Sequence, residues 1–240
     1  MSGEPLFVAD SFGKSFGGRE VLKAATAWAV PGAITVLFGR NGSGKSTLLK
    51  AALGLLRPDF GVVRYDGEAY LRPRLHRLAR RGLMYLPDRG LLSRRRTLSW
   101  HHRLLRLQMK DAPDPAALEL AEARDLLGKA PHEMSGGEVR RAEMSLVLAR
   151  RPRCLIADEP LAGIAPNDKE KVSTALRTLA DGGCAVLVTG HDVEALMTLS
   201  DDVVWVVGGT THWLGSPESA RDHFHFRRDY LGPHRMEEGP

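Results

Sequence analysis

Residues 33–47 read AITVLFGRNGSGKST. The first six residues form a short apolar run with β-branched side chains, which is the composition of a buried strand. The next nine fit the pattern G-x-x-x-x-G-K-[ST], and downstream Leu48, Leu49, Ala52, Leu53 and Leu56 recur at helical spacing. A strand, a glycine-rich loop and a helix in this order predict a phosphate-binding loop.

The residue types in this loop suit a nucleoside triphosphate. Glycines let the backbone turn tightly so that several N–H groups point at a phosphate, and the helix that follows adds the positive end of its dipole. We expect Lys45 to reach the β- and γ-phosphates, Ser46 to ligate Mg²⁺ and Thr47 to add a hydroxyl near the α-phosphate. The alternative is a glycine-rich turn without a ligand, which the flanking strand and helix disfavour. The predicted ATP-binding residues of the loop are Gly39, Arg40, Asn41, Gly42, Ser43, Gly44, Lys45, Ser46 and Thr47.

Composition limits the possible classes of protein. The 240 residues are 43% apolar and 26% charged, and no apolar run approaches the roughly eighteen residues that a membrane span needs. Residues 1–10 have neither the basic nor the apolar region of a secretory signal, so we expect a cytoplasmic protein that does not cross a membrane by itself. Cys154 and Cys184 lie in apolar runs without partners at metal-ligand spacing, and we interpret them as buried small hydrophobes.

The net charge of +5 is unevenly distributed, because arginines are concentrated in the middle of the chain. No ladder of aromatic residues of the kind that stacks on single-stranded nucleic acid is interleaved with them. We therefore expect this region to lie near anionic headgroups or a partner subunit, and we expect no nucleic acid; a merely solvated face is the alternative. The arginines are Arg72, Arg74, Arg77, Arg80, Arg81, Arg89, Arg94, Arg95, Arg96, Arg103 and Arg106.

The remaining periodicity predicts an α/β protein. Two alternating runs separated by Phe16-Gly17-Gly18-Arg19 predict a β-hairpin, and a further strand is expected at 62–65. Residues 92–127 have a helical pattern interrupted at 112–115, which predicts a small helical lobe. The other expected elements are strands at 83–86, 154–157, 185–189 and 203–207, and helices at about 137–149, 167–180 and from 193.

Strands that alternate with helices favour a mostly parallel sheet. We predict one α/β domain over residues 1–240, with a P-loop NTPase core, an antiparallel β subdomain and a small helical subdomain. The core and its β subdomain are expected from residues 1–87 and 146–240, and the helical subdomain from 88–145.

Two adjacent carboxylates, Asp158 and Glu159, follow the apolar strand expected at 154–157. The carboxyl ends of strands in α/β sheets are where ligands bind, and successive strand residues point to opposite faces. We expect Asp158 to hold Mg²⁺ and Glu159 to polarise the attacking water. A surface turn would explain the pair equally well if it stood alone.

A second anion site is predicted at Met134-Ser135-Gly136-Gly137-Glu138. Ser135 offers a hydroxyl and a helix N-cap, and the glycines permit a close approach of the backbone to a phosphate at the start of a helix. A plain N-cap is the alternative interpretation of the serine.

Together these segments resemble the nucleotide-binding subunit of ABC transporters over nearly the full length of the chain. In the resemblance, 39–47 corresponds to the Walker A segment, 154–159 to Walker B and 161–166 to the D-loop. Residues 134–138 correspond to the signature segment, with Met134 for the usual Leu and Glu138 for Gln. Phe16 stands where the family stacks an aromatic on adenine, and His191 stands at the switch-histidine position.

The resemblance implies an ATPase that powers a separately encoded membrane permease. Two subunits, expected to be identical, would dimerise head to tail, each ATP lying between one Walker A segment and the signature residues Ser135, Gly136, Gly137 and Glu138 of the other. Glu159 and His191 would be catalytic, and the subunit would lie peripherally on the inner face of the cell membrane. Residues 161–166, the Ser-Gly-Gly-Glu signature and residues 227–232 resemble the branch of branched-chain amino-acid importers and the lipopolysaccharide-export ATPase.

The chain departs from the family pattern at two places. Asp88 replaces the glutamine of the Q-loop, and Ala165-Pro166 stand where Leu-Asp is common in the D-loop. We expect Asp88 to ligate Mg²⁺ with Ser46 and Asp158; a polar turn with Arg89-Gly90 is the alternative. The alternative function is a soluble ABC ATPase of iron–sulfur cluster assembly or another non-transport role.

Overall fold

The computed structural model describes residues 3–109 and 112–231. The outermost residues of the predicted domain and Gly232, the last residue of the 227–232 run, lie outside these ranges. Within them, no helix is long and apolar enough to cross a membrane.

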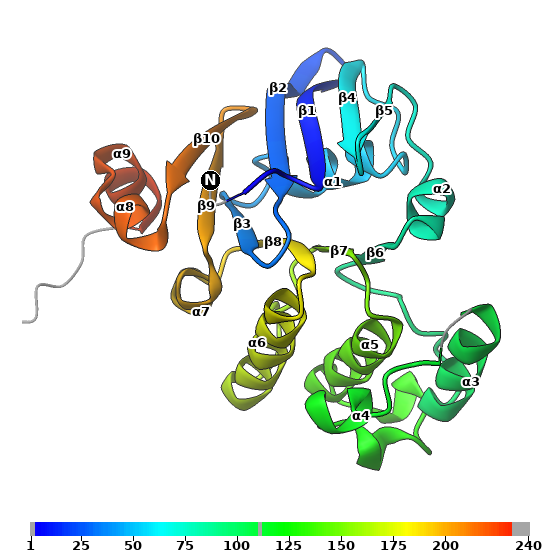
Figure 1. Ribbon diagram of the computed structural model, residues 1–240. Coiled ribbons are helices and arrows are strands. Elements are labelled where there is room, and N and C mark those ends of the chain that lie inside the picture. Colours follow the sequence, from blue (N-terminus) through cyan, green and yellow to red (C-terminus); the bar gives the residue numbers. More distant parts are fainter. Residues whose placement is uncertain (1–2, 110–111, 232–240) are drawn as a thin grey trace, which may run out of the picture.

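A six-stranded sheet forms the centre of the molecule (Figure 1). Its order is β10-β9-β3-β8-β7-β6, and neighbouring strands are parallel except for the edge pair β9 and β10. The mostly parallel sheet predicted from the sequence is confirmed. The strands are β3 (Ile34–Phe38), β6 (Leu83–Leu86), β7 (Cys154–Ala157), β8 (Ala185–Gly190), β9 (Asp202–Val207) and β10 (Thr210–Gly215).

Both faces of this sheet are covered, which explains why its strands read as continuous apolar runs. All five residues of β3 are buried. Val36 and Phe38 pack on the side of the long helices, whereas Leu37 packs on the side of the second sheet. Successive strand residues thus point to opposite faces of the sheet, and a separate hydrophobic core lies on each face. The helices beneath the sheet in Figure 1 are α5 (Gly136–Arg150), α6 (Pro166–Asp181) and α7 (Val193–Leu199).

The second sheet is antiparallel, with the order β2-β1-β4-β5. The predicted hairpin is confirmed, and its two-residue turn is Gly17-Gly18 with φ of 54° and 82°. Such left-handed turns match the twist of the flanking strands, and glycine adopts both angles without strain. Helix α1 (Lys45–Ala52) packs against this sheet. The strands are β1 (Phe7–Phe16), β2 (Arg19–Ala29), β4 (Phe60–Tyr65) and β5 (Glu68–Tyr70).

A helical lobe packs around α5, as predicted, but it begins later than expected. Helix α3 starts at Leu98 rather than near residue 92, because the side chain of Thr97 caps it by accepting a hydrogen bond from the backbone N–H of Trp100. The rest of the lobe consists of α4 (Ala117–Leu120) and the 3₁₀ turns η1 (Arg124–Leu126) and η2 (Pro131–Glu133); α3 ends at Gln108. Helix α5 continues through residue 145, where the predicted helical subdomain ends.

Several elements are absent from the sequence expectations. They are β5, α2 (Leu75–Arg80), η2, β10, α8 (Pro217–Asp222), α9 (Phe224–Phe226) and the π-helical turn η3 (Arg227–Leu231). Helix α2 buries only Leu78, so its pattern lacks an apolar stripe long enough to be read.

Candidate nucleotide site

A cavity of about 700 Å³ opens over the loop between β3 and α1. It brings together most of the predicted site residues, which come from β1, the loop, the end of β6 and the end of β7. Phe16, half-exposed at the end of β1, lies at this cavity and offers a ring face for stacking. The predicted residues that line it are Phe16, Asn41, Gly42, Ser43, Gly44, Lys45, Ser46, Thr47, Asp88, Asp158 and Glu159.

The backbone of the loop is shaped as a phosphate cradle. Gly42 and Gly44 have φ of 79° and 107°, which residues with a side chain rarely adopt. A Cβ on Gly39 would lie 2.8 Å from the backbone carbonyl oxygen of Val206 on β9, so the turn needs glycine there. Ser43 Oγ is buried and has no hydrogen-bond partner among the described residues. A buried hydroxyl without a partner is costly, and a phosphate oxygen would satisfy it.

Lys45 lies at the floor of the cavity and is only 4% exposed. Its Nζ donates to the carbonyl of Gly39 at 2.7 Å and stands 3.9 Å from Glu159 Oε1. Burial lowers the pKa of this ammonium, and the carboxylates of Glu159 and Asp158 act in the opposite direction. A bound phosphate would further favour the charged form.

Asp158 is buried beside the first helical turn of α1. Its Oδ1 accepts hydrogen bonds from Ser46 Oγ at 3.0 Å and from Thr189 Oγ1 at 2.7 Å. A carboxylate and a hydroxyl oxygen at this distance are the hard donors that Mg²⁺ takes together with phosphate oxygens. The pair therefore fits a magnesium ion.

Glu159 lines the cavity and contacts His191, which does not line it but borders a separate cavity of about 190 Å³ on the other side of Glu159. His191 Nδ1 is 3.3 Å from Glu159 Oε2. The backbone of Glu159 is left-handed, with φ of 50°, and its N–H donates to Thr189 Oγ1 at 3.0 Å. Because of this strained conformation, the side chain of Glu159 leaves the backbone in a different direction from the side chains of the extended residues of β7. Thr189, which holds both acidic residues in place, was missed by sequence reasoning because it looks like an ordinary strand residue.

Asp88 lies at the rim of the same cavity. Its side chain is half-exposed and stands 3.8 Å from Arg89 Nε. Its carbonyl accepts a hydrogen bond from Arg140 Nη2 at 2.6 Å. The structure thus brings Asp88 near Asp158 and Glu159, and it ties the backbone of residue 88 to helix α5.

The Ser-Gly-Gly-Glu segment does not line this cavity. Ser135 caps α5, its Oγ accepting from the N–H of Glu138 at 3.2 Å while Glu138 accepts from the N–H of Ser135 at 2.7 Å. Two hydrogen bonds lower the pKa of Glu138 to about 2. The larger effect comes from the Lys129 side chain and the smaller one from the backbone N–H of Ser135. Close packing between α5 and α6 explains the glycine at position 137, because a Cβ there would lie 1.8 Å from the Asp168 side chain on α6. Ser135 and Gly136 remain exposed.

A buried ion pair was also missed. Arg140 donates to Glu143 Oε2 at 2.8 Å and to the carbonyls of Pro87 and Asp88, and both side chains are almost fully buried. Burial raises the pKa of Glu143 to about 7, although Arg140 acts in the opposite direction. Arg140 therefore connects the helix of the Ser-Gly-Gly segment to the Asp88 loop.

Removing this arginine should destabilise the fold in a pH-dependent way. We expect Arg140→Met to cost about 3–5 kcal/mol of unfolding free energy near pH 8, because it leaves a carboxylate buried without its partner. The folded-state pKa of Glu143 is above its unfolded value, so its protonated form is favoured in the fold below about pH 7. The cost should therefore shrink near pH 5.5. Urea unfolding at both pH values measures it.

The double variant R140M/E143L serves as the control. It removes both charges, and it should recover most of the stability at pH 8. An equal loss for the single variant at both pH values would contradict a buried charge as the cause.

The end of the described chain also reaches the loop. Arg40 Nη2 donates to the carbonyl of Asp229 at 2.7 Å, and the ring of Tyr230 packs on Phe38 and Phe226. A second cavity of about 560 Å³ lies between this segment, β9 and the loop. These contacts place Arg40 on the outer side of the loop rather than in the main cavity.

Comparison with known proteins identifies relatives. Residues 22–162 match the family described as ABC transporter, which is more than half of the chain. The chain is 31% identical over 237 residues to the lipopolysaccharide export system ATP-binding protein LptB of Haemophilus influenzae, covering 95% of this chain and 97% of that protein.

Solved structures share the fold. A nucleotide-free ATP-binding cassette from an ABC transporter matches with a TM-score of 0.80 at 20% identity, covering 98% of each chain. A dimeric post-hydrolysis cassette bound to ADP and Pi matches with a TM-score of 0.74 at 21% identity, covering 87% of this chain and 98% of that one. At these identities the likeness shows the fold alone. The predicted fold class is confirmed.

Proposed function

The chain belongs to the ABC transporter family, as an ATP-binding and ATP-hydrolysing subunit, and from this premise we propose how its residues work. Two identical copies close head to tail on two ATP molecules with Mg²⁺. Closure and reopening drive a separately encoded permease, with the subunit held on the inner face of the cell membrane. The observation that carries the proposal is the convergence of Lys45, Ser46, Asp158 and Glu159 on one cavity.

The loop and Lys45 bind the phosphates. Gly42 and Gly44 line the cavity with left-handed φ, so the loop amides around them would bind phosphate oxygens, and the Lys45 ammonium would supply the charge that the terminal phosphates need. Ser46 and Asp158 would hold Mg²⁺, which neutralises charge on the phosphate oxygens when bound. Phe16, which lines the same cavity, would stack on the adenine ring.

Glu159 acts as the general base. Its carboxylate takes a proton from the attacking water, a contribution of typically 10²–10⁴-fold. Thr189 holds its backbone, and His191 at 3.3 Å orients its side chain and can share the proton. The like charges of Asp158 and Glu159 are tolerated because Lys45 lies nearby.

The second half of each site comes from the other subunit. Ser135 and Gly136 are exposed at the start of α5 and lie outside the cavity of their own chain. Their backbone N–H groups, at the positive end of a 15-residue helix, suit a γ-phosphate presented by a second copy. A cassette with the same fold is dimeric when bound to ADP and Pi, which supports a second subunit as the partner.

Co-purification tests the permease partner. The chain, tagged and extracted in detergent from its own cells, should carry a transmembrane protein with it. Recovery only in a soluble complex would contradict transport and favour the non-transport alternative, such as iron–sulfur cluster assembly.

Asp88 should make hydrolysis unusually sensitive to magnesium. Its carboxylate adds negative charge near Asp158, Glu159 and the γ-phosphate, and within residues 3–109 and 112–231 its one ion-pair partner is the exposed Arg89. We expect Asp88→Gln to flatten the dependence of the ATPase rate on free Mg²⁺. Nucleotide affinity at saturating Mg²⁺ should remain nearly unchanged, because Lys45 and the loop amides still hold the phosphates.

The measurement is the ATPase rate against free Mg²⁺ for parent, Asp88→Gln and Asp114→Asn. Asp114 is a carboxylate that does not line the cavity, and it is the matched control. Superimposable curves for parent and Asp88→Gln would place Asp88 outside the magnesium site and favour the polar turn.

A further inference from the structure

Residues 71–109 carry eleven arginines and a single acidic residue, Asp88. The whole chain has a net charge of only +5, so the remainder of the protein is net negative. Ten of these arginines are exposed, and nine of the ten come from three neighbouring segments. We name these nine residues the arginine face. Its residues are Arg72, Arg74, Arg77 and Arg80 at α2, Arg94, Arg95 and Arg96 in the loop before α3, and Arg103 and Arg106 on α3.

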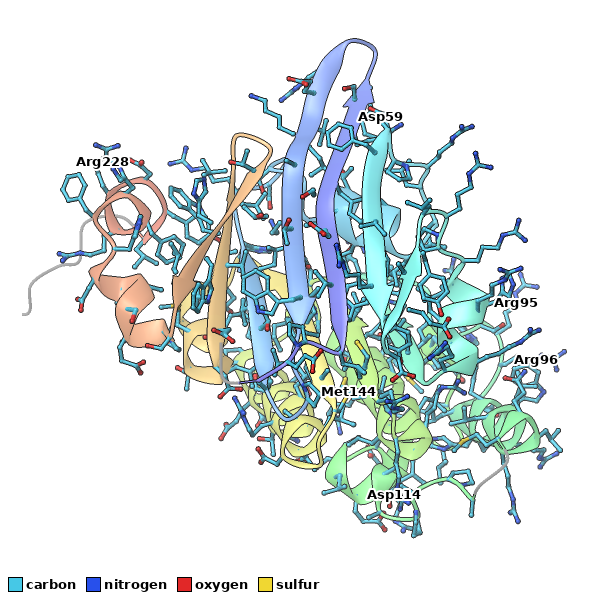
Figure 2. All side chains as sticks on the ribbon, turned by 45° about the horizontal axis from the view of Figure 1, so that its top comes forward. Asp59, Arg95, Arg96, Asp114, Met144 and Arg228 are labelled. Atoms are coloured by element: carbon cyan, nitrogen blue, oxygen red, sulfur yellow. The ribbon has the colours of Figure 1, made fainter. Side chains whose placement is uncertain are left out.

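The fold holds these segments on one side of the molecule. Helix α2 packs on β6, and Arg150 of α5 donates to the carbonyl of Ala79 in α2. The loop before α3 is fastened by a hydrogen bond from Ser93 N–H to His101 Nε2 at 2.9 Å. Figure 2 shows Arg95 and Arg96 at this side, their nitrogen-tipped side chains directed outward between α2 and α3.

The guanidinium groups of the arginine face lack carboxylate partners within the part of the chain that the structure describes. None of the nine forms an ion pair with an acidic side chain of residues 3–109 or 112–231. By contrast, Arg81 and Arg153 both pair with Asp66. Unpaired guanidinium groups keep all their donors available for phosphate oxygens, which they bind in bidentate fashion.

Large apolar side chains stand among these arginines. Leu71 is 77% exposed and Leu107 is 78% exposed, and Trp100 is partly exposed under the guanidinium of Arg96 at 5.3 Å. Nucleic acid would leave such leucines in water. The interface of a bilayer takes up arginine, tryptophan and leucine together, because headgroups bind the charges and the acyl boundary accepts the apolar groups.

We propose that the arginine face is a docking surface for anionic phospholipid headgroups, and that it holds the subunit at the membrane without the permease. Each arginine near an anionic surface contributes about fivefold to the partition coefficient. The attraction is electrostatic, so raised salt weakens it. The proposal rests on the membrane location given in the proposed function, and it adds the surface that contacts the lipid.

Vesicle flotation tests the surface with the full chain alone. The parent should float with phosphatidylcholine vesicles that contain about one third phosphatidylglycerol. With vesicles of pure phosphatidylcholine it should remain at the bottom of the gradient. Arg77→Gln with Arg95→Gln should lower the partition coefficient about thirtyfold. The matched control, Arg221→Gln with Arg227→Gln, removes two exposed arginines outside the face and should change it by less than about threefold.

Three results would overturn the proposal. They are equal flotation with neutral and anionic vesicles, an equal loss for the control pair, or binding to a single-stranded RNA oligonucleotide that exceeds binding to the vesicles. The four side chains are exposed, so unfolding curves that match the parent verify the fold of each variant. A chain that hydrolyses ATP and ignores anionic vesicles would refute the arginine face and leave the proposed function standing.

Discussion

Replacing Lys45 by alanine is expected to abolish tight nucleotide binding. Lys45 is the buried cation at the floor of the cavity, where its Nζ already lies 2.7 Å from the carbonyl of Gly39 and faces Glu159. Alanine removes the charge and leaves the carboxylates of Asp158 and Glu159 beside the phosphates without compensation. Hydrogen bonds to charged groups contribute about 1.5–3 kcal/mol each, so affinity should fall about a hundredfold or more.

The measurement is titration with a fluorescent ATP analogue. Lys171→Ala is the matched control, because Lys171 lies on α6 and pairs with Glu122 away from the cavity. If the analogue bound Lys45→Ala as tightly as the parent, the assignment of the phosphate loop would be wrong.

Replacing Glu159 by glutamine should stop turnover and trap ATP. Glutamine keeps the size of the side chain and its backbone bond to Thr189, but it cannot take a proton from water. The ATPase rate should fall about 10²–10⁴-fold. Since ATP bound between two subunits stabilises the dimer by linkage, the variant should remain dimeric in ATP while the parent returns to monomer as ATP is consumed.

Size-exclusion chromatography with light scattering, alongside the ATPase rate, checks both parts. Glu170→Gln on the exposed side of α6 is the control and should behave as the parent does. A Glu159→Gln protein that is monomeric in ATP and hydrolyses at the parent rate would refute Glu159 as the base.

Local sequence determined most of the elements of this protein. The loop at 39–47 needs glycines at fixed positions, and the strands β3, β7 and β8 are apolar because both faces of their sheet are covered. The site of the two carboxylates at the end of β7 was also predictable, because ligands bind at the carboxyl ends of the strands of a parallel sheet. Helix α2 and strand β10 were not predictable, because neither carries a long apolar periodicity.

The tertiary structure decided which distant residues complete the site. Thr189 reaches Asp158 and Glu159 only because β8 lies beside β7, and Arg140 reaches the Asp88 loop only because α5 packs under β6. These partners are separated by about thirty to fifty residues, and no local pattern encodes a hydrogen bond across such a distance. Sequence therefore determined the chemistry of the phosphate loop and the acidic pair. Packing alone determined how they are held, and why the Ser-Gly-Gly segment lies outside the cavity of its own chain.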